Sequence, residues 1–178
     1  QVFNSTTDKV LPDENRMING FTDYEELTRT RRLIMRSYKL PGNRLRLLHP
    51  NENRGAVTID EERDYHFRYV LEDNFGNRRT YQFIVKGKRQ DIPEYKPEAN
   101  EMLYWNRTNV IQKPGMELVV PRYYVYEDVP LRTDMRGDSS HIAFDYILDA
   151  GRTPIHSYCD LSIGLRHMPV ADTTKYYI

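Results

Sequence analysis

Two consecutive segments decide the fold class: residues 64–72, DYHFRYVLE, and residues 78–85, RRTYQFIV. In the first segment the odd positions hold Tyr, Phe, Tyr and Leu, whereas the even positions include His66, Arg68 and Glu72. Alternation with a period of two is typical of a β-strand that turns one face inward, here the odd face. Between the segments, residues 73–77 contain Gly and Asn, which accept the positive φ angles of a tight turn. The pair therefore predicts a β-hairpin.

Upstream of this hairpin, the sequence predicts one short helix and several short strands. Thr22 is the expected N-cap of the helix, because Glu25 three residues later can complete a capping box with it and acidic residues fill the first turn. The helix should fade near Arg31 and Arg32. Beyond it we expect a strand over 33–38, the turn Pro41-Gly42-Asn43, a returning strand over 44–48 and a brief strand at Val57 and Ile59.

The second half again reads as short strands separated by turns. A boundary is predicted near residues 88–99, which are polar, contain two prolines and show no periodicity. Strands are expected over 102–105, 116–120, 129–133, 142–148 and 161–165, and the run 175–178 resembles the start of another. Strands at this spacing indicate an antiparallel sandwich. The prediction is an all-β chain of two β-sandwich modules, residues 1–92 and 93–178, with one short helix in the first.

Composition argues against several classes of partner. The chain has 178 residues with 26 basic and 26 acidic side chains, so its formal net charge is zero. Binding to nucleic acid or to an anionic membrane surface normally needs a basic patch. The longest apolar runs are far shorter than the roughly 20 residues of a membrane-spanning helix. One Cys allows no internal disulfide, and the start at Gln1 without a leader pattern suggests a piece of a longer protein.

The side chains that most often carry chemistry form no recognised motif. Zinc hydrolases usually show His-x-His or His-Glu-x-x-His, and neither occurs here. We expect His66 on the outward face of its strand and His49 and His167 in loops beside prolines. His156, Cys159 and Asp160 suggest a nucleophilic cysteine, but extended chain would turn them to opposite faces, so a packing cysteine is favoured. The acidic runs 60–64 and 127–128 lack the EF-hand spacing and read as solvated corners.

Aromatic residues supply the candidate contact surface. The sequence contains 14 Tyr, 6 Phe and 1 Trp. Trp105, Tyr123 and Tyr124 are the candidates, because exposed rings bind peptides or sugars. In neighbouring strand positions, however, one ring normally faces inward, so core plus rim remains the alternative. No catalytic, cofactor-binding or metal-ligating residue is assigned.

Several segments resemble one protein family and occur in the same order along nearly the whole chain. They are Arg16–Glu26, Met35–Tyr38, Pro41–Leu45, Asn53–Gly55, Ile59–Tyr65, Asp73–Asn77, Val85–Arg89, Pro114–Met116, Tyr126–Val129, Tyr158–Gly164 and Val170–Thr173. Together they resemble the region C-terminal to the catalytic domain in the large lysostaphin/LytM-type zinc endopeptidases (metallopeptidase family twenty-three) of Bacteroidota.

This resemblance implies a context but no catalytic residue. The family's zinc motifs, a His with an Asp and a His-x-His, act on peptidoglycan cross-links, and no position here matches either motif. What carries over is an exported protein of the periplasm or cell envelope, with immunoglobulin-like β modules after the protease. Zinc is then expected only in the catalytic domain, and the first module is expected to begin before Gln1.

The sequence therefore predicts a non-catalytic accessory region of a peptidoglycan metalloendopeptidase. Its partners would be its own catalytic domain, another envelope protein or peptidoglycan. One alternative is a glycan-binding module, which needs at least two exposed rings on one face. The other is a hydrolase whose site combines His141 and His156 with Asp145 or Asp160. A spacer without any ligand fits the sequence equally well.

Overall fold

The computed structural model describes residues 1–178 apart from 7–8, 10, 13, 94–96, 139–140 and 167–178. Within the described residues, the regular structure consists of antiparallel β-strands, a seven-residue α-helix and a six-residue 3-10 helix. The chain is therefore all-β, as the alternation of its side chains predicts. Two compact units form: Gln1–Gly55 with Pro97–Ile178, and Ala56–Lys96. The predicted division into modules at residues 92 and 93 stays a prediction.

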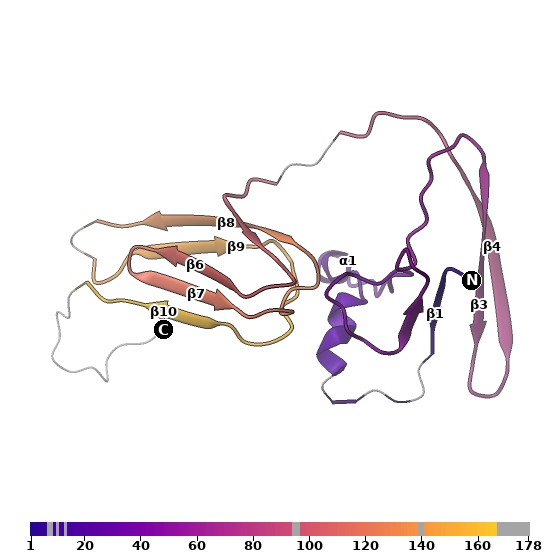
Figure 1. Ribbon diagram of the computed structural model, residues 1–178, viewed down its shortest axis with the longest axis horizontal. Coiled ribbons are helices and arrows are strands. Elements are labelled where there is room, and N and C mark those ends of the chain that lie inside the picture. Colours follow the sequence, from indigo (N-terminus) through magenta and orange to yellow (C-terminus); the bar gives the residue numbers. More distant parts are fainter. Residues whose placement is uncertain (7–8, 10, 13, 94–96, 139–140, 167–178) are drawn as a thin grey trace. The chain divides into compact units, whose positions relative to one another are not determined.

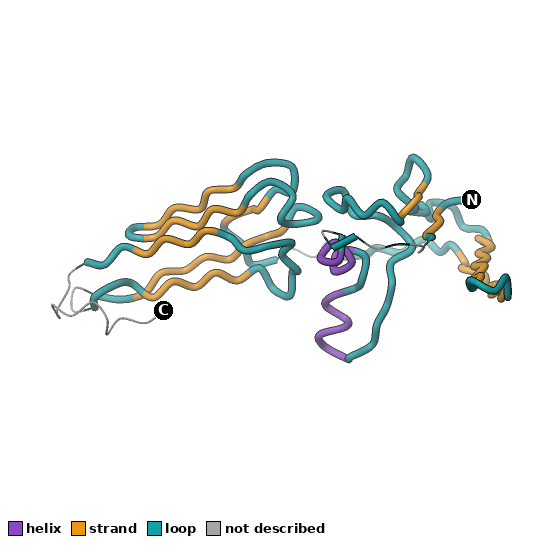
Figure 2. Tube along the Cα trace, turned by 90° about the horizontal axis from the view of Figure 1, so that it is seen from below, coloured by secondary structure: helices purple, strands orange, loops and turns teal. Residues whose placement is uncertain are grey.

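The described part of the second half contains six strands in two antiparallel sheets (Figure 1). One sheet has the order β10-β7-β6 and the other the order β5-β8-β9, and Figure 2 shows the same strands from below. Their bounds are β5 Glu101–Leu103, β6 Asn109–Lys113, β7 Met116–Val120, β8 Val129–Arg136, β9 Asp145–Asp149 and β10 Asp160–Ile163.

Both sheets contribute to one apolar core, which makes this half a sandwich. The buried residues of the core come from β5, β6, β7, β8 and the loop after β7: Leu103, Ile111, Val120, Val125, Val129 and Leu131. In β8 burial alternates, with Val129, Leu131 and Thr133 inward, as a half-buried strand requires. Each fully buried aliphatic side chain contributes about 1.5–3 kcal/mol. The sequence missed β6, where two apolar residues precede Gln112 and Lys113 and give little alternation.

The smaller unit contains the predicted hairpin, formed by β3 (Asp64–Glu72) and β4 (Arg78–Lys86). Phe67 pairs with Phe83 and Tyr69 with Tyr81, and Gly76 in the turn has φ 81°. The expected inward face is correct only at the base of the hairpin, where Tyr65 is 7% exposed. It is wrong farther along, because Tyr69 is 42% exposed and no further strand is described in this unit.

The N-terminal segment of the larger unit, Gln1–Gly55, contains a strand pair and both helices. β1 (Phe3–Ser5) pairs with β2 (Leu48–Pro50), and the 3-10 helix η1 (Asn15–Gly20) precedes α1 (Tyr24–Thr30). The predicted cap of α1 is wrong by one residue. The Asp23 carboxylate accepts the Glu26 N–H at 3.0 Å, whereas Thr22 is buried and bridges to Met35.

Three other predicted strands are not found. Residues 33–38 form only the single bridge at Met35, residues 44–47 are irregular before β2, and residues 56–60 have no strand partner. The turn at residues 41–43 is confirmed, because the Asn43 N–H donates to the Leu40 carbonyl at 3.1 Å. The described residues within 1–92 thus form two strand pairs, β1–β2 and β3–β4, so a sandwich in the first module stays a prediction. The expected strand at 175–178 lies outside the described residues.

Candidate functional site

The loop that connects β7 to β8, residues 121–128, is rich in tyrosine and is called here the tyrosine loop. Val125 and Tyr126 are buried in it, while Tyr123 and Tyr124 are half-buried. Tyr123 has φ 69°, a left-handed conformation that costs a non-glycine residue about 1–2 kcal/mol. The Tyr123 N–H donates to the Trp105 carbonyl at 2.9 Å, which helps to hold this conformation.

Two glycines of the N-terminal segment allow a close approach to the tyrosine loop. A Cβ at Gly20 would lie 2.7 Å from ring atoms of Tyr126, and a Cβ at Gly42 would lie 2.8 Å from the Val125 carbonyl oxygen. The Gly42 N–H donates to the Tyr126 carbonyl at 2.6 Å. The Tyr126 hydroxyl donates to the Arg16 carbonyl at 2.7 Å. Residues 121–126 are therefore fixed against the segment that contains Gly20 and Gly42.

Burial keeps the Tyr126 phenol protonated. The side chain is removed from water, and this burial raises the pKa of Tyr126 to about 12. A phenolic O–H is a donor, so it matches the carbonyl that it contacts. Tyr126 acts here as a structural hydrogen-bond donor.

A pocket of about 260 Å³ opens beside this contact. It is lined by Met17, Gly42 and Arg44 of the N-terminal segment, by loop residues Arg122, Tyr123, Tyr124 and Tyr126, and by His156 and Ser157. Among the described residues, this lining has two guanidinium groups and no carboxylate. Its chemistry therefore favours an anionic group over a cationic one.

Both arginines of the pocket lie over the ring of Tyr123. The guanidinium carbon is 5.3 Å from the ring centroid for Arg44 and 4.4 Å for Arg122. Trp105 contacts the same tyrosine, with ring centroids 6.0 Å apart and planes inclined by 35°. Such cation–π contacts hold the plane of a guanidinium while its N–H groups remain available.

His156 and Ser157 also line the pocket. The backbone N–H of His156 donates to the Tyr124 carbonyl at 2.8 Å. The His156 imidazole contacts the rings of Tyr124 and Tyr126 edge to face. Ser157 accepts a hydrogen bond from the Arg16 guanidinium at 3.0 Å. These residues connect the pocket to the chain that precedes β10.

The structure brings the three predicted contact residues together. Trp105, Tyr123 and Tyr124 meet at one end of the sandwich, where Trp105 and Tyr124 also pack against the core. The role of these residues in binding stays a prediction. The sequence reasoning missed Arg44 and Arg122. Arg122 precedes the tyrosine pair, but no local pattern links it to Arg44.

The residues of the hydrolase alternative are dispersed. The His141 imidazole lies 3.0 Å from the Asp138 carboxylate, whereas His156 contacts the tyrosine loop. Burial raises the pKa of the Cys159 thiol, with Asp160 adding to the effect, so the thiolate is disfavoured. Cys159 packs against the core instead. Among the residues that the structure describes, no three His, Cys, Asp or Glu side chains gather as metal ligands.

The remaining predictions concern single side chains. His66 is exposed on β3, as expected, but His49 lies in β2 and not in a loop; His167 lies outside the described residues. In the acidic run at 60–64 the Arg63 guanidinium pairs with Glu61 at 2.6 Å, so local pairing neutralises part of the charge. Asp128 accepts the Trp105 N–H at 3.2 Å.

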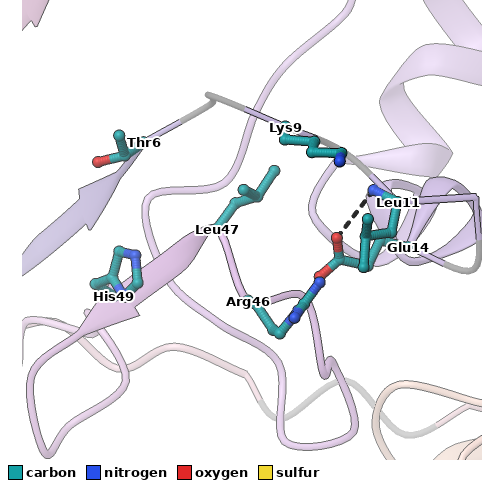
Figure 3. A pocket seen from close by; sticks show the side chains of 7 residues that line it. All are labelled: Thr6, Lys9, Leu11, Glu14, Arg46, Leu47 and His49. Atoms are coloured by element: carbon teal, nitrogen blue, oxygen red, sulfur yellow. Dashed lines mark hydrogen bonds and ion pairs between the residues drawn. The ribbon is translucent and has the colours of Figure 1, made fainter.

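A second pocket, of about 450 Å³, lies beside β2 in the N-terminal segment (Figure 3). Its one carboxylate in the figure, Glu14, is 3% exposed and accepts from Arg46 at 2.7 Å and from the Leu11 N–H at 3.1 Å. These bonds, that of Arg46 first, lower the pKa of Glu14 from 4.5 to about 2. Because the Glu14 carboxylate already binds Arg46 and the Leu11 N–H, we interpret its role as structural: it connects parts of the N-terminal segment.

One family model, described as a Zu5-like domain, matches residues 100–178. The match spans all six strands of the sandwich and the tyrosine loop. No curated protein and no solved structure matches the chain. In the described part of the chain, no helix has the length and apolar character needed to cross a membrane.

Proposed function

We propose that this chain is a non-catalytic accessory region of a cell-envelope peptidoglycan metalloendopeptidase, which positions the protease by binding its partner or the wall. The observation that supports this proposal is the pocket of the tyrosine loop, which presents Arg44, Arg122 and Tyr123 on a fixed framework. The ordered set of segments that resemble this family supplies the context. The protein would act in the periplasm or at the cell envelope.

The geometry suits a module that orients a ligand without transforming it. The loop is held by backbone hydrogen bonds and by contacts at two glycines that leave no space for a side chain. Residues held in this way lose little conformational entropy on binding, which favours affinity. Zinc and the chemistry that it supports would belong to the catalytic domain of the parent protein.

The first test is the reading frame that encodes the chain. We expect a domain with a His-x-His zinc motif upstream of Gln1. A complete frame without such a domain would remove the proposed parentage.

The second test measures the positioning role in the full-length parent protein. Hydrolysis of purified sacculi is compared with hydrolysis of a short soluble cross-linked peptide, for the parent and for a form that lacks this region. Loss of the region should slow the hydrolysis of sacculi and leave that of the short peptide unchanged. Equal rates on both substrates would show that the region does not position the enzyme.

A glycan-binding module is the second candidate, and the β3–β4 hairpin favours it. Exposed rings do form a row on one face: Tyr69 and Tyr81, 42% and 63% exposed, pair across the two strands next to Phe83. Their centroids lie 5.9 and 5.8 Å from that of Phe83. The row lies on the hairpin and not at the three residues selected from the sequence.

Co-sedimentation with purified sacculi tests this candidate. Tyr69→Ala with Tyr81→Ala should release the chain into the supernatant, whereas Ile84→Ala, an exposed change on the opposite face of the hairpin, should not. A chain that stays in the supernatant before any substitution would exclude glycan binding by this face.

The hydrolase alternative requires one zinc per chain, so metal analysis of the purified protein that finds none would remove it.

A further inference from the structure

Two positive charges share one aromatic ring in the pocket of the tyrosine loop. Arg44 and Arg122 come from segments about eighty residues apart, and both guanidinium groups lie over Tyr123. The two groups cannot be farther apart than the sum of their distances to the ring centroid. That separation is within about 10 Å, the range over which charges at the surface act on each other. The two cations therefore repel each other.

Among the described residues, no carboxylate forms an ion pair with Arg44 or Arg122. Other arginines of the same unit are paired, for example Arg46 with Glu14 and Arg132 with Asp149. For Arg44 and Arg122 the described contacts are those with the tyrosine ring. An anion that binds between two such cations is attracted by both of them and relieves their mutual repulsion.

The donor geometry indicates which anions fit. A guanidinium presents N–H groups in a planar fork that matches a carboxylate or a phosphate, and it can do so while its face rests on an aromatic ring. The rest of the lining includes Tyr124 and Ser157, residue types whose hydroxyl groups both donate and accept hydrogen bonds, as the hydroxyl groups of a sugar do. At about 260 Å³ the pocket is sized for a small ligand or for the end of a longer one.

We infer that this pocket binds the oxyanion of an acidic sugar, a carboxylate or a phosphate, between Arg44 and Arg122. The inference rests on the proposed function, because it names the ligand class through which the region would contact the envelope. Tyr123 orients the two guanidinium groups, and its ring face is covered by them. Tyr123 is thus a positioning residue and not a stacking platform for the sugar.

The test uses the whole chain and three soluble probes: D-glucuronate, glucose 6-phosphate and D-glucose. Binding is followed at low salt by amide NMR shifts and by the fluorescence of Trp105, the only tryptophan of the sequence, which contacts Tyr123. At least one anionic probe should bind about tenfold or more tightly than glucose, as charge-assisted hydrogen bonds predict. The arms with glucuronate and glucose 6-phosphate tell which oxyanion the site prefers.

Arginine variants locate the site. Arg44→Gln and Arg122→Gln should each weaken anion binding about tenfold, and Arg122→Lys should restore part of the loss because it keeps the charge without the fork. Arg107→Gln is the matched control, since Arg107 lies 3.8 Å from the ring of Tyr104 in the same sandwich without a second cation. All three arginines are exposed, so the variants should fold.

Two outcomes would overturn the inference: anions that bind no better than glucose, or an equal loss in the Arg107→Gln control. The result is independent of the tests of the proposed function. Anion binding by a chain whose removal leaves sacculus hydrolysis unchanged would retain the site and reject the accessory role. A positioning effect without anion binding would do the reverse.

Discussion

Gly42→Ala tests the contact that builds the pocket. A Cβ at this position would lie 2.8 Å from the Val125 carbonyl oxygen, 2.9 Å from that of Tyr126 and 3.0 Å from the Tyr126 Cα. All three are backbone atoms and cannot rotate away. The Gly42 backbone has no left-handed φ, so steric contact and not torsional strain decides the effect.

The expected cost follows from three contributions. Forcing an extra carbon into a packed contact costs about 1–3 kcal/mol. Lengthening the 2.6 Å hydrogen bond from Gly42 to Tyr126 loses about 0.5–1.5 kcal/mol more. Replacing glycine by alanine restricts the unfolded chain and returns about 0.4–1 kcal/mol. The net loss in the free energy of unfolding is about 2 kcal/mol.

Urea denaturation followed by tryptophan fluorescence measures this loss in the correct unit. Trp105 lies in the sandwich, and it is the only tryptophan in the sequence. With a denaturant dependence of about 1–3 kcal/mol per molar urea, the midpoint should fall by about 1 M. Because Arg44 lies two residues beyond Gly42, affinity for the anionic probe should fall as well.

Gly164→Ala is the control for this substitution. A Cβ at Gly164 would lie 3.6 Å from the Gly115 carbonyl oxygen, which is an ordinary contact, and Gly164 has no left-handed φ. Its midpoint should equal or slightly exceed that of the unsubstituted chain, because the restriction of the unfolded chain contributes about 0.4–1 kcal/mol and no steric cost opposes it. If Gly42→Ala were equally silent, the N-terminal segment and the tyrosine loop would not be in contact in solution, and the pocket would lose its basis.

Three further substitutions test other parts of the structure. Tyr126→Phe removes a buried hydroxyl from its carbonyl acceptor and should lower the free energy of unfolding by about 1–2 kcal/mol, measured by urea denaturation. Leu131→Ala should cost about 2–5 kcal/mol in the same assay, whereas Val110→Ala, 52% exposed on β6, should stay within about 0.5 kcal/mol; similar losses would contradict the sandwich core. Glu14→Gln should destabilise the chain at neutral pH, and the difference should shrink as pH falls from about 5 to 2. The reason is that the pKa of Glu14 is lower in the folded state than in the unfolded chain, so its contribution is present above 4.5 and is lost through the folded value of about 2. A pH-independent difference would show that the Arg46 pairing does not form.

Local sequence patterns predict where strands form, but they do not predict what packs against those strands. Residues 64–86 reveal their hairpin because alternation and a Gly-containing turn are both local. The exposure of Tyr69 could not be foreseen, because periodicity shows that two faces differ and not whether anything covers one of them. The shift of the helix cap from Thr22 to Asp23 has a tertiary cause, since Thr22 is buried in its bridge to Met35.

The residues of the candidate site likewise fall into those that the sequence could indicate and those that it could not. Trp105, Tyr123 and Tyr124 could be selected because aromatic residues between strands are candidates for contact. Gly42 was interpreted as a turn former, which it is, but its close approach to Tyr126 depends on a segment about eighty residues away. Such a contact has no signature in one sequence, because both partners have ordinary local roles.

The backbone of Tyr123 supplies a last argument for function over packing. A left-handed φ of 69° at an aromatic residue and two adjacent guanidinium groups both cost stability. A residue that only filled the end of the sandwich would incur neither cost, and glycine would meet the backbone requirement better. The strained conformation does have one consequence that glycine could not provide: it places a ring under both Arg44 and Arg122. Stability given up at that position is therefore best explained by a ligand that contacts both cations, and binding of that ligand would stabilise the folded chain by an amount that rises with the logarithm of its concentration above Kd.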